Sequence, residues 1–362
     1  MYNDNQRSVY QGKKIRVEIF GASHAPEIGV KIDGLKGERF DGAALQSFLD
    51  RRKPKSNAAS TPRKEDDKVL FEQGVDGENI LGEVVAVIKN SNQKSRDYDK
   101  TYMIPRPAHA DFVAWSKYGN GFDHRGGGKF SGRLTAPMCI AGGICKQLLE
   151  KSGVKINAYI SKIGTVQGKG YGDVDQERFD FSALNKDFPT IDEKDAIKMQ
   201  EQITSARENL DSVGGEIECV ITGVPVGSGE YMFDSIESVI SHLAFAVPAV
   251  KGIAFGSGFD LTSMRGSAAN DPFTMDNGRI KTQTNHNGGI NGGIANGMPI
   301  TFKVAIKPTP SIGREQTTVN MQTKEKVKIK IEGRHDSCIV PRAVPVIEAI
   351  AAMAIYDIVE GE

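Results

Sequence analysis

The chain has 362 residues, which is enough for one large domain or two smaller ones with a sizeable hydrophobic core. Lysine plus arginine and aspartate plus glutamate balance at 46 each, so the net charge excludes a general attraction to nucleic acid or to an acidic membrane surface. The N-terminal segment lacks the apolar core of a signal peptide, and the chain has no run of about 18 apolar residues. We therefore expect a cytoplasmic protein that binds neither nucleic acid nor membranes.

Short apolar runs, several with period-two alternation, predict β-strands and favour half-exposed antiparallel sheets. These runs are residues 15–20, 29–32, 83–88, 155–160, 216–221, 300–306 and 327–331. Helices are predicted to begin where aspartate can cap free N–H groups or proline can occupy the first turn. Their predicted first residues are Asp41, Pro137, Asp192, Asp234 and Pro345.

The last predicted helix, residues 346–359, is apolar on nearly every face, so we expect it to be central and buried. No proline- or serine-rich linker divides the chain. We predict an α+β fold in one large domain spanning residues 1–362, a β-α-β sandwich with central helices between antiparallel sheets. A faint similarity between residues 31–54 and 220–248 leaves open a divergent duplication of a ββα unit.

Glycine and ionisable residues occur together in several segments. DHRGGGKFSGR, residues 123–133, places Gly126, Gly127 and Gly128 between cationic side chains, where glycine N–H groups can approach an anion or a flat ring. A glycine triplet alone is also typical of a plain turn. Related segments are GASHAPEIGVKIDG at 21–34, RPAHAD at 106–111 and GRHDSCIVPRAVP at 333–345.

Histidine is well suited to proton transfer near neutral pH, and the chain has only 6 histidines. Those within the glycine-containing segments are His24, His109, His124 and His335. His242 lies among apolar neighbours and is expected to be structural, whereas His286 stays undecided. The cysteines, Cys139, Cys145, Cys219 and Cys338, form no CxxC pair, so we expect reduced structural thiols and no metal site.

These segments, together with PAVKGIAFGSGF at 248–259, NGGINGG at 287–293 and KPTPS at 307–311, closely resemble chorismate synthase over nearly the whole chain. The resemblance implies a lyase of the shikimate pathway and of aromatic amino acid biosynthesis. It implies conversion of 5-enolpyruvylshikimate 3-phosphate to chorismate by anti-1,4-elimination of phosphate and a C6 proton. It further implies reduced FMN as a cofactor without net redox change, NADPH only indirectly for flavin reduction, an external flavin reductase as a partner, and a homotetramer.

The resemblance also assigns site residues. His24 is implied as the acid beside the departing phosphate, His109 as the group that protonates the reduced flavin, and Asp336 as a participant in removal of the C6 proton near flavin N5. Ser23 and Ser131 are implied as accessory serines that act as relays or hydrogen-bond partners. Implied flavin contacts are Lys129, Phe130, Ser131, Pro248, Ala249, Gly292, Lys307, Pro308, Thr309, Pro310, Ser311 and Arg334. Implied substrate-binding residues are Arg52, Arg133 and Arg342.

Departures from the family pattern leave alternatives open. Ala25 and Ala108 stand where relatives commonly have glycine, and Ala58 stands where a second arginine is expected, which Lys55 or Arg63 could replace. The alternatives are a bifunctional enzyme with NADPH-dependent flavin reductase activity and an inactive flavin-binding homologue. Asp336 could instead pair with Arg334 or Arg342, and His124 and His335 could be peripheral.

Overall fold

The computed structural model describes residues 8–53, 67–90, 103–119, 123, 125–331 and 336–361. Two five-stranded sheets, antiparallel throughout, form the framework. The first sheet has the order β1-β2-β3-β5-β4. Its strands are β1 (Ser8–Gln11), β2 (Arg16–Gly21), β3 (Glu27–Asp33), β4 (Leu70–Asp76) and β5 (Asn79–Lys89).

The second sheet has the order β7-β6-β8-β14-β9. Its strands are β6 (Lys155–Ile163), β7 (Val166–Gln167), β8 (Gly215–Thr222), β9 (Val250–Phe255) and β14 (Ile300–Ile306). Alternate residues of β6 face opposite sides: Ile156, Ala158 and Ile160 join the main core, whereas Tyr159 joins a smaller cluster with Val220. The period-two pattern of the sequence thus corresponds to the two faces of a real sheet.

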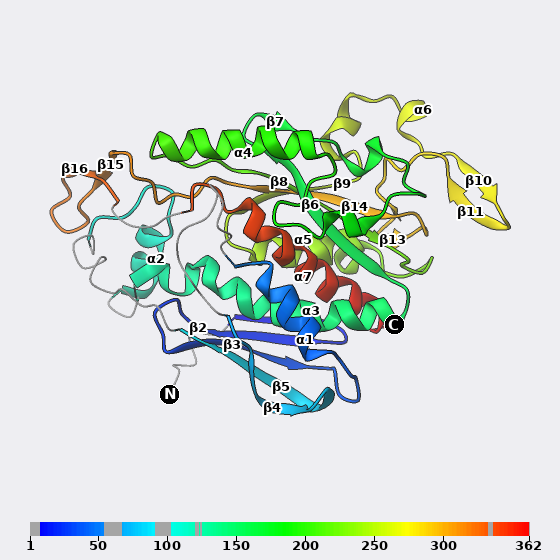
Figure 1. Ribbon diagram of the computed structural model, residues 1–362, viewed down its shortest axis with the longest axis horizontal. Coiled ribbons are helices and arrows are strands. Elements are labelled where there is room, and N and C mark those ends of the chain that lie inside the picture. The colour runs from blue at the N-terminus through cyan, green and yellow to red at the C-terminus, as the bar shows by residue number, and fades with distance from the viewer. Residues whose placement is uncertain are drawn as a thin grey trace.

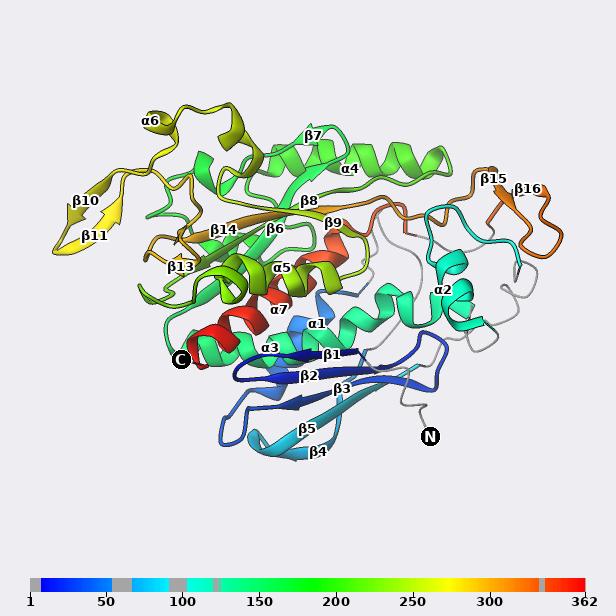
Figure 2. The same cartoon turned by 180° about the vertical axis from the view of Figure 1, so that it is seen from behind.

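Helices α1 (Gly42–Asp50), α3 (Thr135–Lys151), α5 (Ile236–Ala246) and α7 (Val340–Val359) lie between the two sheets (Figures 1 and 2). Helix α4 (Glu193–Glu208) lies along the outer side of the second sheet. Gly142 lets α3 approach α7 closely, because a Cβ atom there would lie 2.4 Å from Ala349 Cβ. The prediction of an α+β fold with antiparallel sheets is therefore confirmed.

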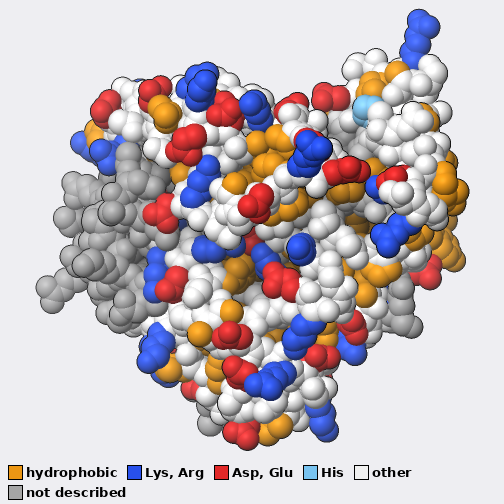
Figure 3. All heavy atoms as spheres, turned by 45° about the vertical axis from the view of Figure 1, so that its right-hand side comes forward, with side chains coloured by type: hydrophobic (Ala, Val, Ile, Leu, Met, Phe, Trp, Pro, Cys, Tyr) orange, Lys and Arg blue, Asp and Glu red, His pale blue; other side chains and the backbone are white. Residues whose placement is uncertain are grey.

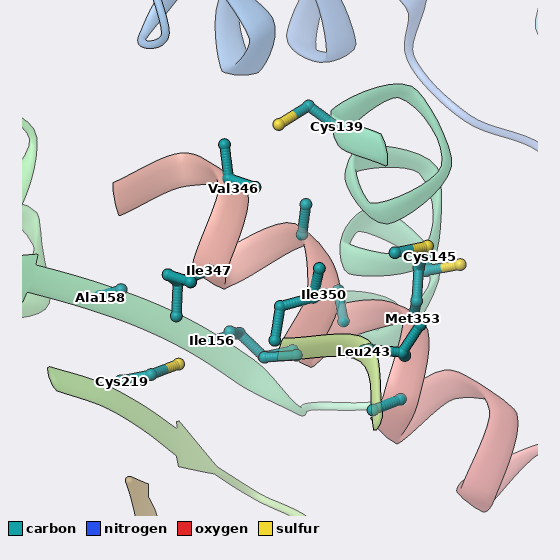
Figure 4. Close-up of a cluster of buried hydrophobic side chains, with 14 of the residues drawn as sticks. Cys139, Cys145, Ile156, Ala158, Cys219, Leu243, Val346, Ile347, Ile350 and Met353 are labelled. Atoms are coloured by element: carbon teal, nitrogen blue, oxygen red, sulfur yellow. The ribbon is translucent and has the colours of Figure 1, made fainter. Parts of the chain in front are cut away.

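Helix α7 is buried along almost its whole length, as predicted. Figure 4 shows it passing between strand β6, which carries Ile156 and Ala158, and helix α3, which carries Cys139 and Cys145. All four cysteines are free and buried, which confirms the prediction of structural thiols. Burial raises the pKa of the Cys139 thiol to about 12, so this sulfur stays protonated at neutral pH.

One carboxylate lies inside this apolar layer. Glu348, on α7, accepts hydrogen bonds from both terminal nitrogens of Arg51 at 2.7 Å and from Lys146 Nζ at 2.9 Å. Burial alone would raise the Glu348 pKa, but Lys146 and Arg51 lower it from an ordinary 4.5 to about 2. The charge is therefore compensated, as a buried ion requires.

Three helix starts differ from the prediction, whereas Asp41 and Asp192 cap α1 and α4 as expected. Helix α3 begins at Thr135, two residues before Pro137. Helix α5 is capped by Ser235, whose hydroxyl accepts from Ser238 N, and Asp234 instead ends the short turn before it. Helix α7 begins at Val340 and not at Pro345, because Pro341 occupies the first turn and Pro345 is accommodated within the helix.

Small elements surround the layers. They are α2 (Asp111–Tyr118), α6 (Gly266–Ala269) and the hairpins β10 (Phe273–Asp276)–β11 (Arg279–Thr282), β12 (Ile290–Asn291)–β13 (Ile294–Ala295) and β15 (Gln316–Val319)–β16 (Lys326–Ile329). The β10–β11 hairpin projects from the body, and apolar side chains gather on that flank in Figure 3. Within the described ranges, no helix is both long enough and apolar enough to span a bilayer.

Candidate active site

The three consecutive glycines form an irregular turn between α2 and α3. Gly126, Gly127 and Gly128 have φ angles of 59°, 87° and 54°, a region that favours glycine. The carbonyl of Gly128 accepts a hydrogen bond from Ser23 N at 3.2 Å, so this turn packs against the GASH segment that follows β2. We call residues 126–128 the triglycine turn.

His24 lies against the first glycine of this turn and is only 5% exposed. A Cβ atom on Gly126 would stand 2.3 Å from His24 Cε1, so only glycine leaves room for the ring. Ser23 Oγ donates to the Arg125 carbonyl at 3.1 Å and lies 3.0 Å from His24 Nδ1. Because the single hydroxyl proton of Ser23 is already used, its oxygen accepts from Nδ1–H, and His24 Nε2 remains for proton transfer.

His109 lies against the second glycine. A Cβ atom on Gly127 would stand 3.2 Å from His109 Nε2 and 3.3 Å from Cε1. The two predicted acids therefore converge on adjacent residues of one turn, although 85 positions separate 24 from 109 in the sequence. Packing against successive glycines lets both rings approach the backbone, which a side chain at either position would prevent.

A charged network fixes the RPAHAD segment at the start of α2. Asp111 Oδ1 lies 2.6 Å from His109 Nδ1, and Arg106 donates to both carboxylate oxygens of Asp111 through Nε at 2.7 Å and Nη2 at 2.8 Å. Burial alone would raise the Asp111 pKa, but hydrogen bonds from Arg106 and His109 hold it well below its usual range. Asp111 is therefore ionised at neutral pH.

The KPTPS segment is joined to the same network. Lys307 Nζ donates to the Ala108 carbonyl at 2.6 Å, and Arg106 Nη1 donates to Ser311 Oγ at 3.3 Å. Lys307 N donates to the carbonyl of Ala249, which has a positive φ of 75° and follows Pro248. The predicted flavin contacts of residues 248–249 and 307–311 are thus brought beside His109.

Other predicted flavin contacts lie around the triglycine turn or farther away. Lys129 Nζ is 3.4 Å above the ring of Tyr118 at the end of α2, and Phe130 also packs against Tyr118. Ser131 Oγ accepts from Arg133 N at 3.2 Å and begins the next short turn. Gly292, with φ of 62°, lies in the β12–β13 turn with open space beside its α-carbon.

Two buried hydroxyls indicate that a polar group belongs beside KPTPS. Thr309 Oγ1 and Ser337 Oγ are buried and have no hydrogen-bond partner among the described residues. The two residues are bound by neighbouring residues of the chain, Ser212 and Val213. Ser212 Oγ donates to the Thr309 carbonyl, and Val213 N donates to the Ser337 carbonyl. Unsatisfied buried hydroxyls and the cationic Lys307 fit the polar edge of a flavin or its phosphate.

The predicted substrate arginines form a second cluster. Asp67 accepts from Arg52 Nη1 at 2.8 Å and closely from Arg133 Nη1, while Arg342 Nη1 donates to Asp336 Oδ2 at 2.7 Å. Arg342 Nε also donates to the Arg52 carbonyl at 2.9 Å, which joins the two ion pairs. Arg52 is 4% exposed, so its guanidinium is committed mainly to Asp67 and to Thr135 Oγ1.

Some predicted or weighed residues lie outside the described residues: Arg334, His335, His124, Lys55, Ala58 and Arg63. Asp336 pairs with Arg342, one of its two considered partners. His242 packs edge-on against Tyr10 with ring centroids 5.6 Å apart, and His286 Nδ1 lies 2.9 Å from Ser257 Oγ.

Sequence reasoning missed Asp67, Arg106 and Asp111 as site residues. Arg106 and Asp111 were visible inside the RPAHAD motif, where a carboxylate two residues after a histidine signals a possible pair within one turn. Asp67 carried no such signal, because its partners Arg52 and Arg133 are distant in sequence and meet it only in the folded chain.

Ala108 adopts a left-handed backbone with φ of 57°, which explains why a glycine is expected there. Ala25, in contrast, is not among the non-glycine residues with positive φ. The two alanine departures therefore differ: only Ala108 carries backbone strain.

Two histidines on a glycine turn, beside clustered arginines and carboxylates, define an α+β enzyme that combines acid–base chemistry with anion binding. The family model for chorismate synthase matches residues 15–359, so the chain belongs to the chorismate synthase family, whose members are carbon–oxygen lyases. The resemblance predicted from the motifs is thereby confirmed.

Relatives named chorismate synthase match almost the full chain. The one from Lancefieldella parvula is 42% identical over 360 residues, covering 96% of this chain and 94% of the relative. The one from Parabacteroides distasonis is 42% identical over 349 residues, covering 96% of each chain. A crystal structure of a chorismate synthase matches with a TM-score of 0.72 over 96% of this chain and 92% of that one, and at 21% identity it supports the fold.

Proposed function

We propose that this enzyme converts 5-enolpyruvylshikimate 3-phosphate to chorismate. The C–O bond to phosphate and the C6–H bond break, a new C=C bond forms, and no net oxidation occurs. The observation that carries the proposal is the convergence of His24 and His109 on Gly126 and Gly127, next to cations that suit an anionic substrate. This elimination needs two kinds of help from the protein: charge stabilisation of the leaving phosphate and groups that transfer protons.

The arginine cluster binds the substrate's phosphate and carboxylates. Arg342 is the most accessible of its members, with a side chain 24% exposed against 9% for Arg133 and 4% for Arg52. Asp67 fixes Arg52 and Arg133 in one arrangement, so little conformational entropy is lost when an anion binds. In this role Arg52 acts partly by holding Asp67, and Arg342 and Arg133 make the more direct contacts.

The two histidines hold protons at successive glycines of the triglycine turn. His24, whose Nδ1 is turned to Ser23, presents Nε2 as the acid for the departing phosphate. His109 presents its own Nε2 beside Gly127. Asp336, held by Arg342, accepts the C6 proton, and Ser131 remains an accessory hydrogen-bond partner.

Reduced FMN, when bound, supplies transient electron density to the allylic system of the substrate. Lys307, Thr309 and Ser311 hold it through their cationic and hydroxyl groups, and Ala249 and Pro248 present their backbone. Lys129, Phe130, Gly292 and Arg334 complete the proposed contacts. The orphaned Thr309 hydroxyl supports this assignment.

The exposed apolar side chains on the flank around the β10–β11 hairpin support assembly of several copies, and we propose that this flank forms an interface of a homotetramer. Its large exposed apolar side chains include Phe259, Phe273, Met275 and Ile280. A separate flavin reductase is the proposed source of reduced FMN, and the proposed location is the cytoplasm. We retain one domain spanning residues 1–362, a β-α-β sandwich, as part of the proposal, and the ββα duplication stays open.

Anaerobic turnover tests the proposed reaction. Purified enzyme is mixed with 5-enolpyruvylshikimate 3-phosphate and photoreduced FMN, and chorismate is followed by absorbance. Chorismate should form in many-fold excess over flavin, and admission of oxygen should stop it. Formation at full rate with oxidised FMN and no reductant would contradict the cofactor assignment, and no chorismate under either condition would leave the inactive flavin-binding homologue.

A test with NADPH distinguishes the proposed monofunctional enzyme from the bifunctional alternative with flavin reductase activity. With oxidised FMN and NADPH as the only reductant, the proposed monofunctional enzyme should neither consume NADPH nor form chorismate until a flavin reductase is added. Consumption of NADPH by the purified chain alone would establish the bifunctional enzyme instead.

A further inference from the structure

The distance between His109 and Asp111 determines which ring nitrogen carries a proton. Asp111 is ionised, so its oxygens are acceptors, and an acceptor oxygen can approach Nδ1 to 2.6 Å only if Nδ1 bears hydrogen. Arg106 Nη2 also lies 3.1 Å from Nδ1 and has a second hydrogen beside the one donated to Asp111 Oδ1 at 2.8 Å, but the shorter contact decides, because two acceptor atoms with no hydrogen between them would repel each other at 2.6 Å. His109 therefore donates through Nδ1, and its other nitrogen, Nε2, is the one at which a proton is gained or lost.

The Asp111 carboxylate is itself held in place from three directions. Arg106 Nε and Nη2 form a two-pronged contact with it, and Arg106 N donates to Oδ2 at 3.0 Å. Arg106 is in turn bonded to Ser311, and Lys307 holds the neighbouring Ala108 carbonyl. Asp111 is therefore a rigid support, since its own hydrogen bonds leave it little freedom to rotate away from His109.

We propose that Asp111 is the positioning residue of His109, holding the ring by Nδ1–H so that Nε2 is turned toward Gly127 and the reacting groups. Its catalytic consequence rests on the proposed function, in which His109 transfers a proton, whereas its effect on the ring does not. The chain from Asp111 through Arg106 to Ser311 also ties the orientation of this ring to the segment proposed to hold FMN.

The charged groups around His109 are accounted for within the described residues. Asp111 and Arg106 come from its own segment, and Lys307 faces the loop from the segment after β14. Gly127, which packs against the ring, has no side chain, and the Ser131 Cβ atom lies 3.9 Å from a Cβ built on Gly127. Asp111 is therefore the anion that lies in direct contact with the ring.

Asp111→Asn tests the proposal, because asparagine keeps the shape but can present an N–H₂ group to Nδ1. Solid-state ¹⁵N NMR of histidine-labelled protein, with the His109 signals assigned by their loss in His109→Gln, reports which nitrogen is protonated. The parent protein should show a protonated Nδ1 in the neutral ring, and Asp111→Asn should show a mixture of both tautomers. Turnover should fall about 10- to 100-fold, a typical loss when a supporting hydrogen-bond partner of a functional histidine is removed, with KM little changed.

Asp192→Asn is the matched control. It also removes the charge of an ion-paired aspartate, the one that pairs with Lys169 at 2.9 Å, but it lies at the α4 cap and asparagine caps helices equally well. Tautomer and turnover should both stay as in the parent. Asp111→Glu, which restores a carboxylate, should recover Nδ1 protonation. Asp111→Ser, which also removes the carboxylate, replaces Asp111→Asn as the test if that variant fails to fold.

The two readouts separate the positioning role from the proposed reaction. An unchanged His109 tautomer in Asp111→Asn would overturn the positioning role, whatever happens to turnover. A changed tautomer with undiminished turnover would support positioning of the ring and overturn the assignment of His109 as a catalytic acid. A changed tautomer with a 10- to 100-fold lower rate supports both.

Discussion

His24 turns its Cε1 and Nδ1 to the triglycine turn, whereas His109 turns its Nε2 and Cε1 to it, and different groups bind the Nδ1 atoms of the two rings. His24 Nδ1 contacts the neutral hydroxyl of Ser23, which itself donates to the Arg125 carbonyl. Behind His109 is the carboxylate of Asp111, within a charged network that extends to Lys307. Charge-assisted hydrogen bonds are about twice as strong as neutral ones, so the two rings are held by different forces.

The difference indicates a division of labour between packing and charge. We infer that His24 is oriented mainly by close contact with Gly126, because the hydrogen bond between its Nδ1 and Ser23 is neutral. His109 touches Gly127 less tightly and is oriented mainly by Asp111. Steric changes should therefore disturb the first ring more, and electrostatic changes the second.

The largest expected effect is the loss of either ring. His24→Ala and His109→Ala should each lower anaerobic turnover by roughly 10²- to 10⁴-fold, the usual contribution of a general acid, and should affect KM less. His242→Gln is the control, since that ring packs against Tyr10 and is expected to be structural. Near-parental rates in both alanine variants would show that neither ring transfers a proton in the rate-limiting steps.

The triglycine turn allows the steric half of the comparison to be tested. Gly126→Ala places a methyl group 2.3 Å from the buried His24 ring, whereas Gly127→Ala places one 3.2 Å from His109 Nε2. Overpacking costs typically about 1–3 kcal/mol, so Gly126→Ala should lose more stability and more turnover than Gly127→Ala. Urea unfolding and anaerobic rates measure both losses.

Two exposed glycines separate backbone strain from the clash. Gly77 has φ of 58°, close to the 59° of Gly126, and Gly37 has φ of 92°, close to the 87° of Gly127, and open space surrounds both α-carbons. Their alanine variants should show only the left-handed penalty of about 1–2 kcal/mol. If Gly126→Ala cost no more than Gly77→Ala, contact with the His24 ring would not be what fixes that position.

Lowering the pH tests the electrostatic part of the comparison, the contribution of Asp111 beside His109. The Asp111 pKa is lowered in the folded protein, so its hydrogen bonds stabilise the fold fully above the ordinary carboxyl pKa of 3.8 and are lost as pH falls through the lower folded value. The stability difference between the parent and Asp111→Asn, about 1.5–3 kcal/mol at neutral pH for a charged hydrogen bond, should shrink only below pH 3.8.

Ser23→Ala provides the contrasting titration. A serine hydroxyl does not ionise, so its stability difference from the parent should stay constant as Asp111 is protonated. The comparison is made between pH 3.8 and about pH 2, because the Glu348 pKa of about 2 keeps that buried carboxylate ionised beside Lys146 and Arg51 over this range. A Ser23→Ala difference that fell in parallel with that of Asp111→Asn would indicate general acid unfolding instead.

Local patterns predicted much of the fold, since strand alternation and the apolar residues 346–359 report directly on faces that are buried. The start of α7 was missed because Pro345 resembles a first-turn proline, whereas Pro341 holds that place. At the site, motifs indicated His24 and His109, but the burial of Arg52 could not be foreseen. That burial depends on Asp67 and Thr135, which reach Arg52 through tertiary packing.

The smallest expected effect distinguishes the two alanines that accompany the histidines. Ala108→Gly removes a left-handed penalty of about 1–2 kcal/mol beside His109, against an entropy cost of about 0.4–1 kcal/mol in the unfolded chain, so stability should rise slightly. Ala25→Gly, beside His24, has no such strain to relieve and should lose about 0.4–1 kcal/mol. Urea unfolding midpoints measure both changes. Stability changes of opposite sign would show that, of the two alanines, only Ala108 carries backbone strain, in the loop where Lys307 and Arg106 hold it in its unfavourable conformation. Stability changes of the same sign would refute that difference.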